Sequence, residues 1–324
     1  MPDSTPTQAP RDFQQHLAEL DKAGLLVRID RPINKDTELQ PLVRWQFVGG
    51  VPESERRAFL FTNVVDGKGR RYDMQVAIGV FASSPEIYAR GMGKKAEDIG
   101  NAWVNAVRNP IAPVATDKPA CQEVVITGDD LRKPGGGLAA LPVPVSTPGF
   151  DSAPYLTATL CVSRDPENGI QNMGTYRAAL KATDRLVVRM VARVGGAGGW
   201  MHWLKYRERK QMMPMAIVLG AAPVVFFTGP QKLPVDMDEM AVAGGLGGEA
   251  IRMTKCLTVD LNVPADAEIV IEGMIDLEYV EPEAPFGESH GHVALEEYNM
   301  PMRVTAITLP APIFAIGLML TPST

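Results

Sequence analysis

Apolar residues in the first hundred positions recur first at helical and then at strand spacing. Phe13, Leu17 and Leu20 share one face of a helix, and the run LVRI at residues 26–29 is typical of a strand. Further helices are predicted near residues 39–47, from residue 85 and over residues 96–107, with strands at residues 59–61 and 74–80. This alternation predicts a small α/β domain over residues 1–115. The Pro-rich, aperiodic stretch at residues 109–120 marks its end.

Beyond this boundary the pattern changes to short apolar runs separated by Gly and Pro. Many short strands of this kind favour a barrel or sandwich over a doubly wound parallel sheet. The chain is therefore predicted to be α+β, with a β-rich second domain over residues 116–324. Strands are predicted at residues 123–127, 155–163, 215–220, 256–261, 268–272 and 304–309, a hairpin turn at 164–169, and helices at 183–193 and 236–244.

Composition and charge argue against two classes of protein. Charged residues make up 22% of the chain and the formal net charge is -6, without any basic run, which disfavours a nucleic-acid surface. The apolar stretch at residues 307–320 is broken by Pro310, Pro312 and Gly317, so it predicts two buried strands and not a membrane span. The 3 cysteines are widely spaced, which indicates neither a disulfide framework nor a thiolate metal site, and a cytoplasmic location is expected.

Two glutamates flank a Pro-Phe-Gly bend in the segment EAPFGESHGH, residues 283–292. In a straight strand, the odd spacing of Glu283 and Glu288 would put them on opposite faces, whereas a bend can return both to one cavity. Two carboxylates in a partly dry pocket cannot both ionise easily, so one takes a raised pKa and becomes a proton donor. The plainer interpretation is a solvated loop of glutamates, with His290 and His292 exposed beside them.

Other polar residues admit both a functional and a structural interpretation. Asn172 and Arg177, in the segment GIQNMGTYR, offer an amide oxygen for a hard cation and a planar fork for a carboxylate. Taken alone, this segment fits an exposed turn. Glu239 lies early in a predicted helix, where an acid also complements the helix dipole. His202 lies among tryptophans, where a packed core histidine is the plainer interpretation.

The order of these motifs is more specific than any one of them. NMGTYR, DEMAVAGGLGGEAIRMTKC, VPADAEIVIEG and EAPFGESHG follow one another between residues 172 and 291. In this order they resemble the UbiD family of prenylated-FMN-dependent decarboxylases, and the likeness extends from about residue 12 to the end. The resemblance implies a small N-terminal α/β domain followed by a split β-barrel of the flavin-reductase kind. It also implies reversible removal of CO2 from aromatic or α,β-unsaturated carboxylic acids.

The resemblance carries a catalytic trio, a cofactor site and a metal site onto this chain. Arg177, Glu283 and Glu288 match the family's trio, with Glu288 as the proton donor and the other two as an ion pair that orients the substrate. A divalent cation, Mn2+ or Mg2+, is expected at Asn172 and Glu239, with K+ nearby. Many members have a histidine where this chain has Arg193, so either His202 is the third metal ligand, which is the preferred choice, or Arg193 grips the phosphate directly. Prenylated FMN (prFMN) is expected to contact Asn172, Met173, Thr175, Tyr176, Arg177, Arg189, Met190, Val191, Arg193 and Glu239.

The resemblance also bears on partners. Family members continue into a C-terminal domain with a dimerisation helix, so this chain is expected to be a fragment or one piece of a split enzyme, and a homo-oligomer at full length. The expected partners are a carboxylic acid, CO2 and a flavin prenyltransferase that supplies the cofactor. Two alternatives stay open: a catalytically silent flavin-binding module, and a flavin reductase that uses FMN and NADH, in which the acidic pair has no use.

Overall fold

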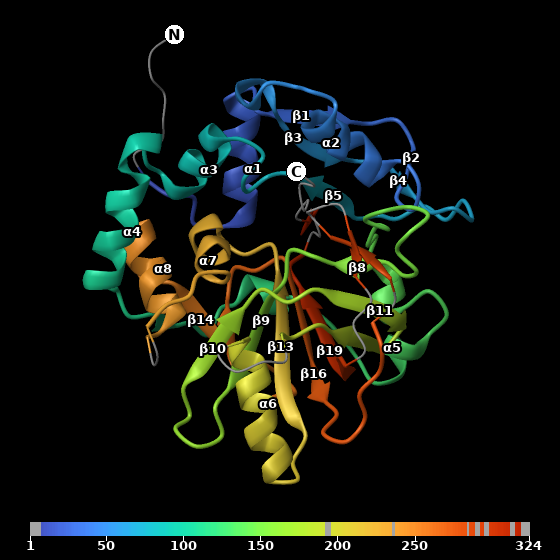
Figure 1. Ribbon diagram of the computed structural model, residues 1–324, viewed down its shortest axis with the longest axis vertical. Coiled ribbons are helices and arrows are strands. Elements are labelled where there is room, and N and C mark those ends of the chain that lie inside the picture. Colours follow the sequence, from blue (N-terminus) through green and yellow to red (C-terminus); the bar gives the residue numbers. More distant parts are fainter. Residues whose placement is uncertain are drawn as a thin grey trace.

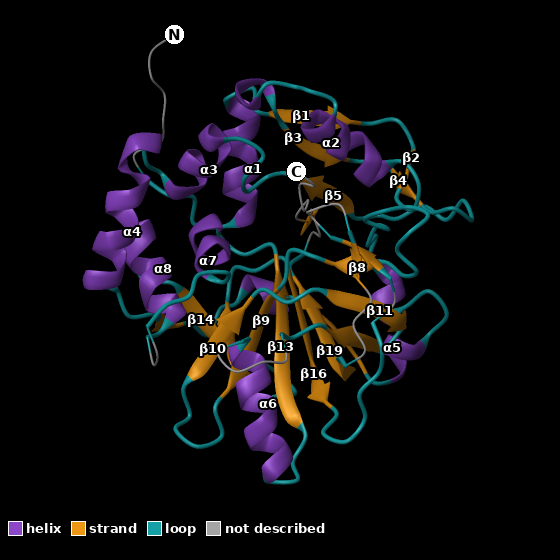
Figure 2. Ribbon diagram, in the orientation of Figure 1, coloured by secondary structure: helices purple, strands orange, loops and turns teal. Residues whose placement is uncertain are grey.

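The computed structural model describes residues 8–191, 196–234, 237–283, 285–288, 292–294, 298–311 and 315–318, the last four of them by their backbone. These residues form a mixed α+β fold in which a small sheet and its helices lie against one end of a larger sheet (Figure 1). Helices and strands alternate in the N-terminal third, and strands dominate the rest (Figure 2). No helix in the described ranges has the length and apolar character needed to cross a bilayer.

The smaller sheet has four strands in the order β1-β3-β5-β20. β1 pairs parallel with β3, and β20, from the far end of the described chain, pairs parallel with β5. The strands predicted in the first hundred residues and the second strand predicted within residues 307–320 are thereby confirmed. The elements here are α1 (Phe13–Lys22), β1 (Leu26–Ile29), β2 (Ile33–Asn34), α2 (Leu39–Val48), β3 (Ala58–Phe61), β4 (Val64–Val65), β5 (Gln75–Ile78), α3 (Pro85–Met92), α4 (Ile99–Arg108) and β20 (Ala315–Leu318).

The larger sheet has nine strands, which pair antiparallel, in the order β10-β9-β13-β16-β19-β12-β11-β8, with β7 also pairing to β19. These pairings trace an open, branched path and not a closed ring, so the split β-barrel stays a prediction. The strands are β7 (Val124–Thr127), β8 (Tyr155–Leu156), β9 (Leu160–Arg164), β10 (Gln171–Gly174), β11 (Ala178–Ala182), β12 (Arg185–Val188), β13 (Met213–Leu219), β16 (Ile269–Ile275) and β19 (Met300–Leu309).

Short helices and small sheets surround the larger sheet. α6 lies along β9 and β10, and α8 packs against α7 and α4. Shorter strands form a three-stranded sheet (β15-β14-β6) and a two-stranded one (β17-β18). These elements are β6 (Val114–Ala115), α5 (Asp129–Arg132), α6 (Gly198–Glu208), α7 (Pro223–Thr228), α8 (Glu239–Gly247), β14 (Arg252–Lys255), β15 (Asn262–Pro264), β17 (Phe286–Gly287) and β18 (Val293–Ala294).

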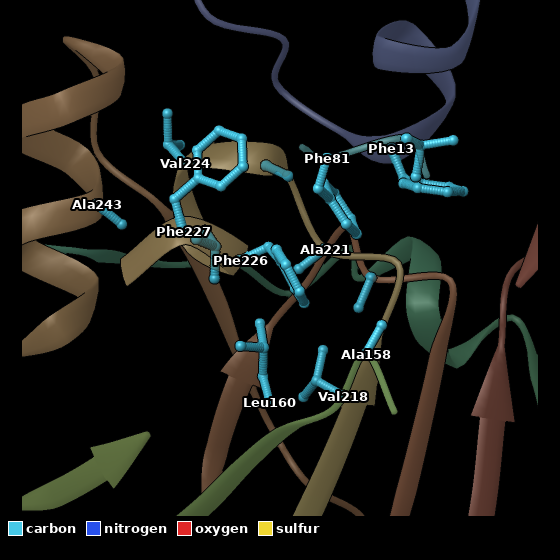
Figure 3. Packing of buried hydrophobic residues seen from close by; sticks show 14 of the residues in the cluster. Phe13, Phe81, Ala158, Leu160, Val218, Ala221, Val224, Phe226, Phe227 and Ala243 are labelled. Atoms are coloured by element: carbon cyan, nitrogen blue, oxygen red, sulfur yellow. The ribbon is translucent and has the colours of Figure 1, made fainter. Parts of the chain in front are cut away.

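The hydrophobic core runs across the predicted boundary near residue 115. Phe81, which follows β5, stacks on Phe226 of α7 with ring centroids 4.0 Å apart, and also contacts Phe13 of α1 (Figure 3). Leu160 and Val218, from neighbouring strands of the larger sheet, belong to the same cluster. Burial of each of these large apolar side chains contributes about 1.5–3 kcal/mol to the free energy of unfolding. Together they hold the N-terminal helices against the larger sheet.

Two predicted elements are wrong. The helix predicted at residues 183–193 is absent over its described part, residues 183–191: Arg185–Val188 form β12, which lies between β11 and β19 in the larger sheet. Their apolar residues satisfy a helical spacing, but the β-branched pair Val187-Val188 is buried within a sheet. Residues 256–261 are not a strand but the connection between β14 and β15, where the buried carboxylate of Glu272 accepts the backbone N–H groups of Leu257 and Thr258.

A buried histidine joins α1 to the end of β5. His16 is completely buried, its Nε2–H donates to the carbonyl oxygen of Val80 over 2.6 Å, and its ring stacks on Phe81. Nδ1 has no hydrogen-bond partner among the described residues. Burial lowers the pKa of His16 to about 4, and the hydrogen bond to Val80 only partly opposes this.

We expect the free energy of unfolding to decrease as the pH falls from about 7 to 4. The unfolded chain takes up a proton at His16 near the ordinary value of 6.5, whereas the folded chain does so only near 4. Over that interval the unfolded state therefore binds more protons, and His16 alone accounts for a loss of about 2–3 kcal/mol. In His16→Gln, which keeps a donor for Val80, this part of the pH dependence should be missing from urea denaturation curves. An identical slope in the two proteins would contradict the assignment to His16.

Candidate active site

Arg177 joins two acidic residues that lie more than a hundred positions further along the chain. It occupies the connection between β10 and β11, and its backbone carbonyl accepts the N–H of Arg189 over 2.9 Å. Its guanidinium donates from Nε and Nη2 to the two carboxylate oxygens of Glu283, at 2.5 and 2.8 Å. Nη1 donates to Glu288 at 2.7 Å. The predicted convergence of these three side chains is therefore present in the structure.

The three groups differ in their exposure to solvent. The side chain of Glu283 is 2% exposed, that of Arg177 16% and that of Glu288 24%. Glu283 is thus the buried partner, held by a bidentate fork, and Glu288 is the partner nearest to solvent. Glu283 therefore serves to hold Arg177 in place, whereas the carboxylate of Glu288 is accessible to a bound molecule.

The stretch between the two glutamates contains a short strand, and residue 284 lies outside the described residues. β17 (Phe286–Gly287) pairs antiparallel with β18, and the N–H of Glu288 donates to the carbonyl of His292 over 2.8 Å. The Phe286 ring lies 4.5 Å from the Arg177 guanidinium carbon and packs on Tyr155 of β8. A ring face in this position stabilises the cation and helps to orient its fork. His290 lies outside the described residues.

A cavity of about 930 Å³ opens beside this ion-pair cluster. Its volume is at the upper end of the range usual for cofactor and ligand sites. Of the predicted residues, Met190 is completely buried in the core, Glu283 lies behind Arg177, and Arg193 is outside the described residues. The others line the cavity: Asn172, Met173, Thr175, Tyr176, Arg177, Arg189, Val191, His202, Glu239 and Glu288. A second cavity of about 280 Å³, between the N-terminal segment and β14, contains none of them.

Glu239, the first residue of α8, faces the cavity and the strand β10. Its carboxylate accepts a hydrogen bond from the backbone of Met173, and burial raises its pKa to about 7. No ion pair of Glu239 is present among the described residues. A partly buried carboxylate without a cationic side chain is a suitable ligand for a metal ion.

The glycines that open α6 bring two predicted cofactor contacts together. The Tyr176 hydroxyl accepts the N–H of Gly199 at 3.1 Å, and a Cβ on Gly198 would lie 2.3 Å from Oδ1 of Asn172. Only glycine permits this approach, which places the N-terminus of α6 in the cavity wall. Sequence reasoning missed this helix, although the Gly-rich run before an apolar segment marks where it begins.

His202 lies on α6 and is nearly buried. Its Nδ1 is hydrogen-bonded to the Ser163 hydroxyl at 2.9 Å, and burial lowers its pKa. The ring lines the same cavity as Asn172 and Glu239. No group of three or more His, Cys, Asp or Glu residues suited to a metal ion is found in the described part of the chain. A metal site here would therefore depend on the amide oxygen of Asn172.

Two models of one protein family match consecutive parts of this chain. The model of the 3-octaprenyl-4-hydroxybenzoate carboxy-lyase N-terminal domain matches residues 17–107. The model of the Rift-related domain of the same carboxy-lyase matches residues 112–318. Together the two models cover nearly all of the described residues.

Solved structures with the same fold include enzymes that bind a flavin. An evolved dimeric form of the UbiD-class enzyme HmfF from Pelotomaculum thermopropionicum, in complex with prFMN, is 26% identical with a TM-score of 0.85, and the match covers 97% of this chain and 68% of that one. HmfF in complex with FMN is 27% identical with a TM-score of 0.84, covering 97% and 65%. The apo 3,4-dihydroxybenzoic acid decarboxylase of Enterobacter cloacae is 23% identical with a TM-score of 0.84, covering 97% and 66%, and shows the fold alone. This chain thus spans about two thirds of the length of these proteins.

Proposed function

The chain belongs to the UbiD family of carboxy-lyases, and from this membership we propose that it removes CO2, reversibly, from an aromatic or α,β-unsaturated carboxylic acid with the help of prFMN. The observation that carries the proposal is the guanidinium of Arg177 bound by Glu283 and Glu288 at the wall of a flavin-sized cavity. Such a cluster combines a fixed ion pair with a solvent-accessible carboxyl group.

Glu288 acts as the general acid of this reaction. Decarboxylation needs an electron sink that no side chain supplies, and the bound cofactor provides it. After CO2 leaves, a proton must reach the carbon that carried it, and a positioned carboxylic acid supplies such a proton efficiently. Glu288 is the carboxylic acid of the trio that lines the cavity, whereas Glu283 is enclosed behind Arg177. Arg177 and Glu283 hold Glu288 in place and orient the substrate carboxylate.

The residues of the cavity suit a phosphorylated flavin. The hydroxyl oxygen of Thr175 is buried in the wall without a hydrogen-bond partner among the described residues, so it can bond to a ring edge or a ribityl oxygen. The N-cap residue of α6, Ala197, makes no side-chain cap bond, and apart from the Gly199 N–H held by Tyr176 the N–H groups of this helix N-terminus favour phosphate. Arg189 adds a cation to the same wall.

A divalent cation, Mn2+ or Mg2+, fits at Glu239, Asn172 and His202, with K+ nearby. The carboxylate and amide oxygens are hard ligands, and the tautomer of His202 that donates from Nδ1 to Ser163 leaves Nε2 free to coordinate. The cation would link Glu239 to the cofactor phosphate. We extend the proposal to two partners that family membership implies: a flavin prenyltransferase that supplies prFMN, and a second copy of the full-length chain.

Glu239→Ala is expected to weaken Mn2+-dependent FMN binding by at least about tenfold, because it removes the anionic ligand. Quenching of flavin fluorescence, titrated with and without Mn2+, measures this change. Glu97→Ala is the control, since Glu97 is also an acid in the first turn of a helix, here a 3-10 helix, but is exposed and does not line the cavity. Unchanged affinity in Glu239→Ala would remove Glu239 from the metal site.

The proposed activity is tested by reconstituting the chain with prFMN, Mn2+ and K+. CO2 release from a panel of aromatic and acrylic acids is then followed, together with deuterium exchange in the decarboxylated products at the carbon that carried the carboxylate. Either signal, dependent on prFMN and absent with FMN alone, supports the decarboxylase. Bound prFMN with neither signal would favour the catalytically silent flavin module, and NADH oxidation would favour a flavin reductase.

A further inference from the structure

A carboxylate outside the predicted trio holds the segment that carries Glu288. Oδ1 of Asp151 accepts the N–H of Gly287 at 2.7 Å, and Oδ2 accepts the N–H of Thr147 at 2.7 Å. The backbone of Ser146 contributes a further hydrogen bond to the same carboxylate. Asp151 thereby ties a loop before β8 to the strand β17, which is 136 residues away along the chain.

The loop at residues 147–152 is shaped to receive this strand. The N–H groups of Phe150 and Asp151 both donate to the carbonyl of Thr147 at 3.0 Å, which closes the loop on itself. The N–H of Ser152 donates to the carbonyl of Pro285 at 3.3 Å, so the loop is bonded to both sides of Phe286. These bonds fix the backbone from which the side chains of Phe286 and Glu288 project to Arg177.

Gly287 lies so close to the loop that no side chain fits there. A Cβ on Gly287 would lie 2.3 Å from Oγ1 of Thr147 and 2.8 Å from its Cβ. Because Thr147 is β-branched and its backbone is bonded to Asp151, it has little freedom to move away. The close contact and the two hydrogen bonds of Asp151 therefore restrain the same peptide unit.

We propose that Asp151 is a positioning residue for proton transfer: by holding the N–H of Gly287, it keeps the carboxyl group of Glu288 against Arg177 and at the cavity wall. The inference rests on the proposed decarboxylase function for its effect on turnover, but not for its effect on geometry. Asp151 has no direct contact with the reacting carbon in this scheme. It acts through the backbone of Gly287, and its charge also lies within electrostatic range of Arg177.

Asp151→Asn tests the proposal with almost no change in volume. The asparagine offers one acceptor, and its NH2 group faces an N–H donor, so one of the two amide bonds is lost. Asp66→Asn is the control for the loss of a carboxylate charge alone, because both backbone N–H groups bound by Asp66, those of Lys68 and Arg70, go to Oδ1, which asparagine keeps, in an exposed turn that does not line the cavity. Both variants should bind FMN as the wild type does.

Two measurements do not depend on turnover. In Asp151→Asn, amide hydrogen exchange across residues 285–288 and carbodiimide labelling of Glu288, both read by mass spectrometry, should become at least about tenfold faster. Neither should change in Asp66→Asn. Gly287→Ala, which displaces the strand without altering Asp151, should give the same acceleration and serves if Asp151→Asn does not fold. Rates of exchange and labelling equal to those of the wild type in Asp151→Asn and Gly287→Ala would overturn the proposal.

Turnover provides the third measurement. A displacement of about 1 Å can lower a rate about a hundredfold, so kcat of Asp151→Asn should fall by that order while KM changes less than about threefold. A wild-type kcat would overturn the positioning role even if the strand is loosened. If the wild-type chain itself turns over none of the acids, the decarboxylase proposal fails, and the exchange and labelling results alone decide whether Asp151 places Glu288.

Discussion

Glu288→Gln is expected to reduce CO2 release, and deuterium exchange in the decarboxylated product, by about a hundredfold or more. Glutamine keeps the shape of the side chain, and its carbonyl oxygen can still accept the hydrogen bond from Nη1 of Arg177. It cannot deliver a proton, and general acid catalysis by a positioned group is usually responsible for a factor of about 10²–10⁴. Because glutamine has nearly the same volume and Glu283 still neutralises Arg177, the flavin content and the melting temperature should stay close to those of the wild type.

The control for this variant is Glu278→Gln, which alters an exposed glutamate in the connection after β16. It should turn over as the wild type does. Deuterium exchange is the sharper of the two assays, because it reports proton transfer even when CO2 release is limited by another step. Full exchange in Glu288→Gln would exclude Glu288 as the donor and would point to water or another acid.

Sequence patterns correctly predicted the elements whose own apolar residues show which side is buried. α1 buries Phe13, Leu17 and Leu20 at helical spacing, and β13 presents one continuous apolar run between two neighbouring strands. Residues 185–188 follow a helical spacing as well, but they pair on both sides with strands distant in sequence, and these pairings decide their structure. A periodicity describes one segment, whereas sheet pairing depends on another, so β12 could not be assigned from its own residues.

In the candidate site, too, some residues could be predicted from sequence motifs and others could be found only from contacts between distant segments. The motifs predicted that Arg177, Glu283 and Glu288 share one site, and the structure brings them together across 106 and 111 positions of sequence. Asp151 was missed because its function depends on the backbone N–H of Gly287, which has no side chain to signal a partner. Its signal in the sequence was limited to a Pro-Gly turn followed by an acid. An acid near a turn is usually explained by local capping, and its long-range hydrogen bond is visible only in three dimensions.

Arg177→Met is expected to abolish turnover and also to destabilise the fold. The substitution removes three hydrogen bonds and leaves Glu283, with a side chain only 2% exposed, as a buried carboxylate without a cation. Removing one partner of a buried ion pair typically costs about 3–5 kcal/mol. Urea denaturation of the apo protein measures this loss without any contribution from the cofactor.

The double variant Arg177→Met/Glu283→Gln separates the stabilising role of Arg177 from its role in catalysis. Neutralising Glu283 removes the unpaired buried charge, so more than half of the lost free energy of unfolding should return, whereas turnover should not. Arg185→Met is the matched control, because its partner Glu281 keeps Lys181 at 3.8 Å and Arg185 is 43% exposed, so a loss of about 1 kcal/mol or less is expected. If the double variant were no more stable than Arg177→Met, the cost would come from lost packing against Phe286, and the charge of Glu283 would not be what Arg177 neutralises.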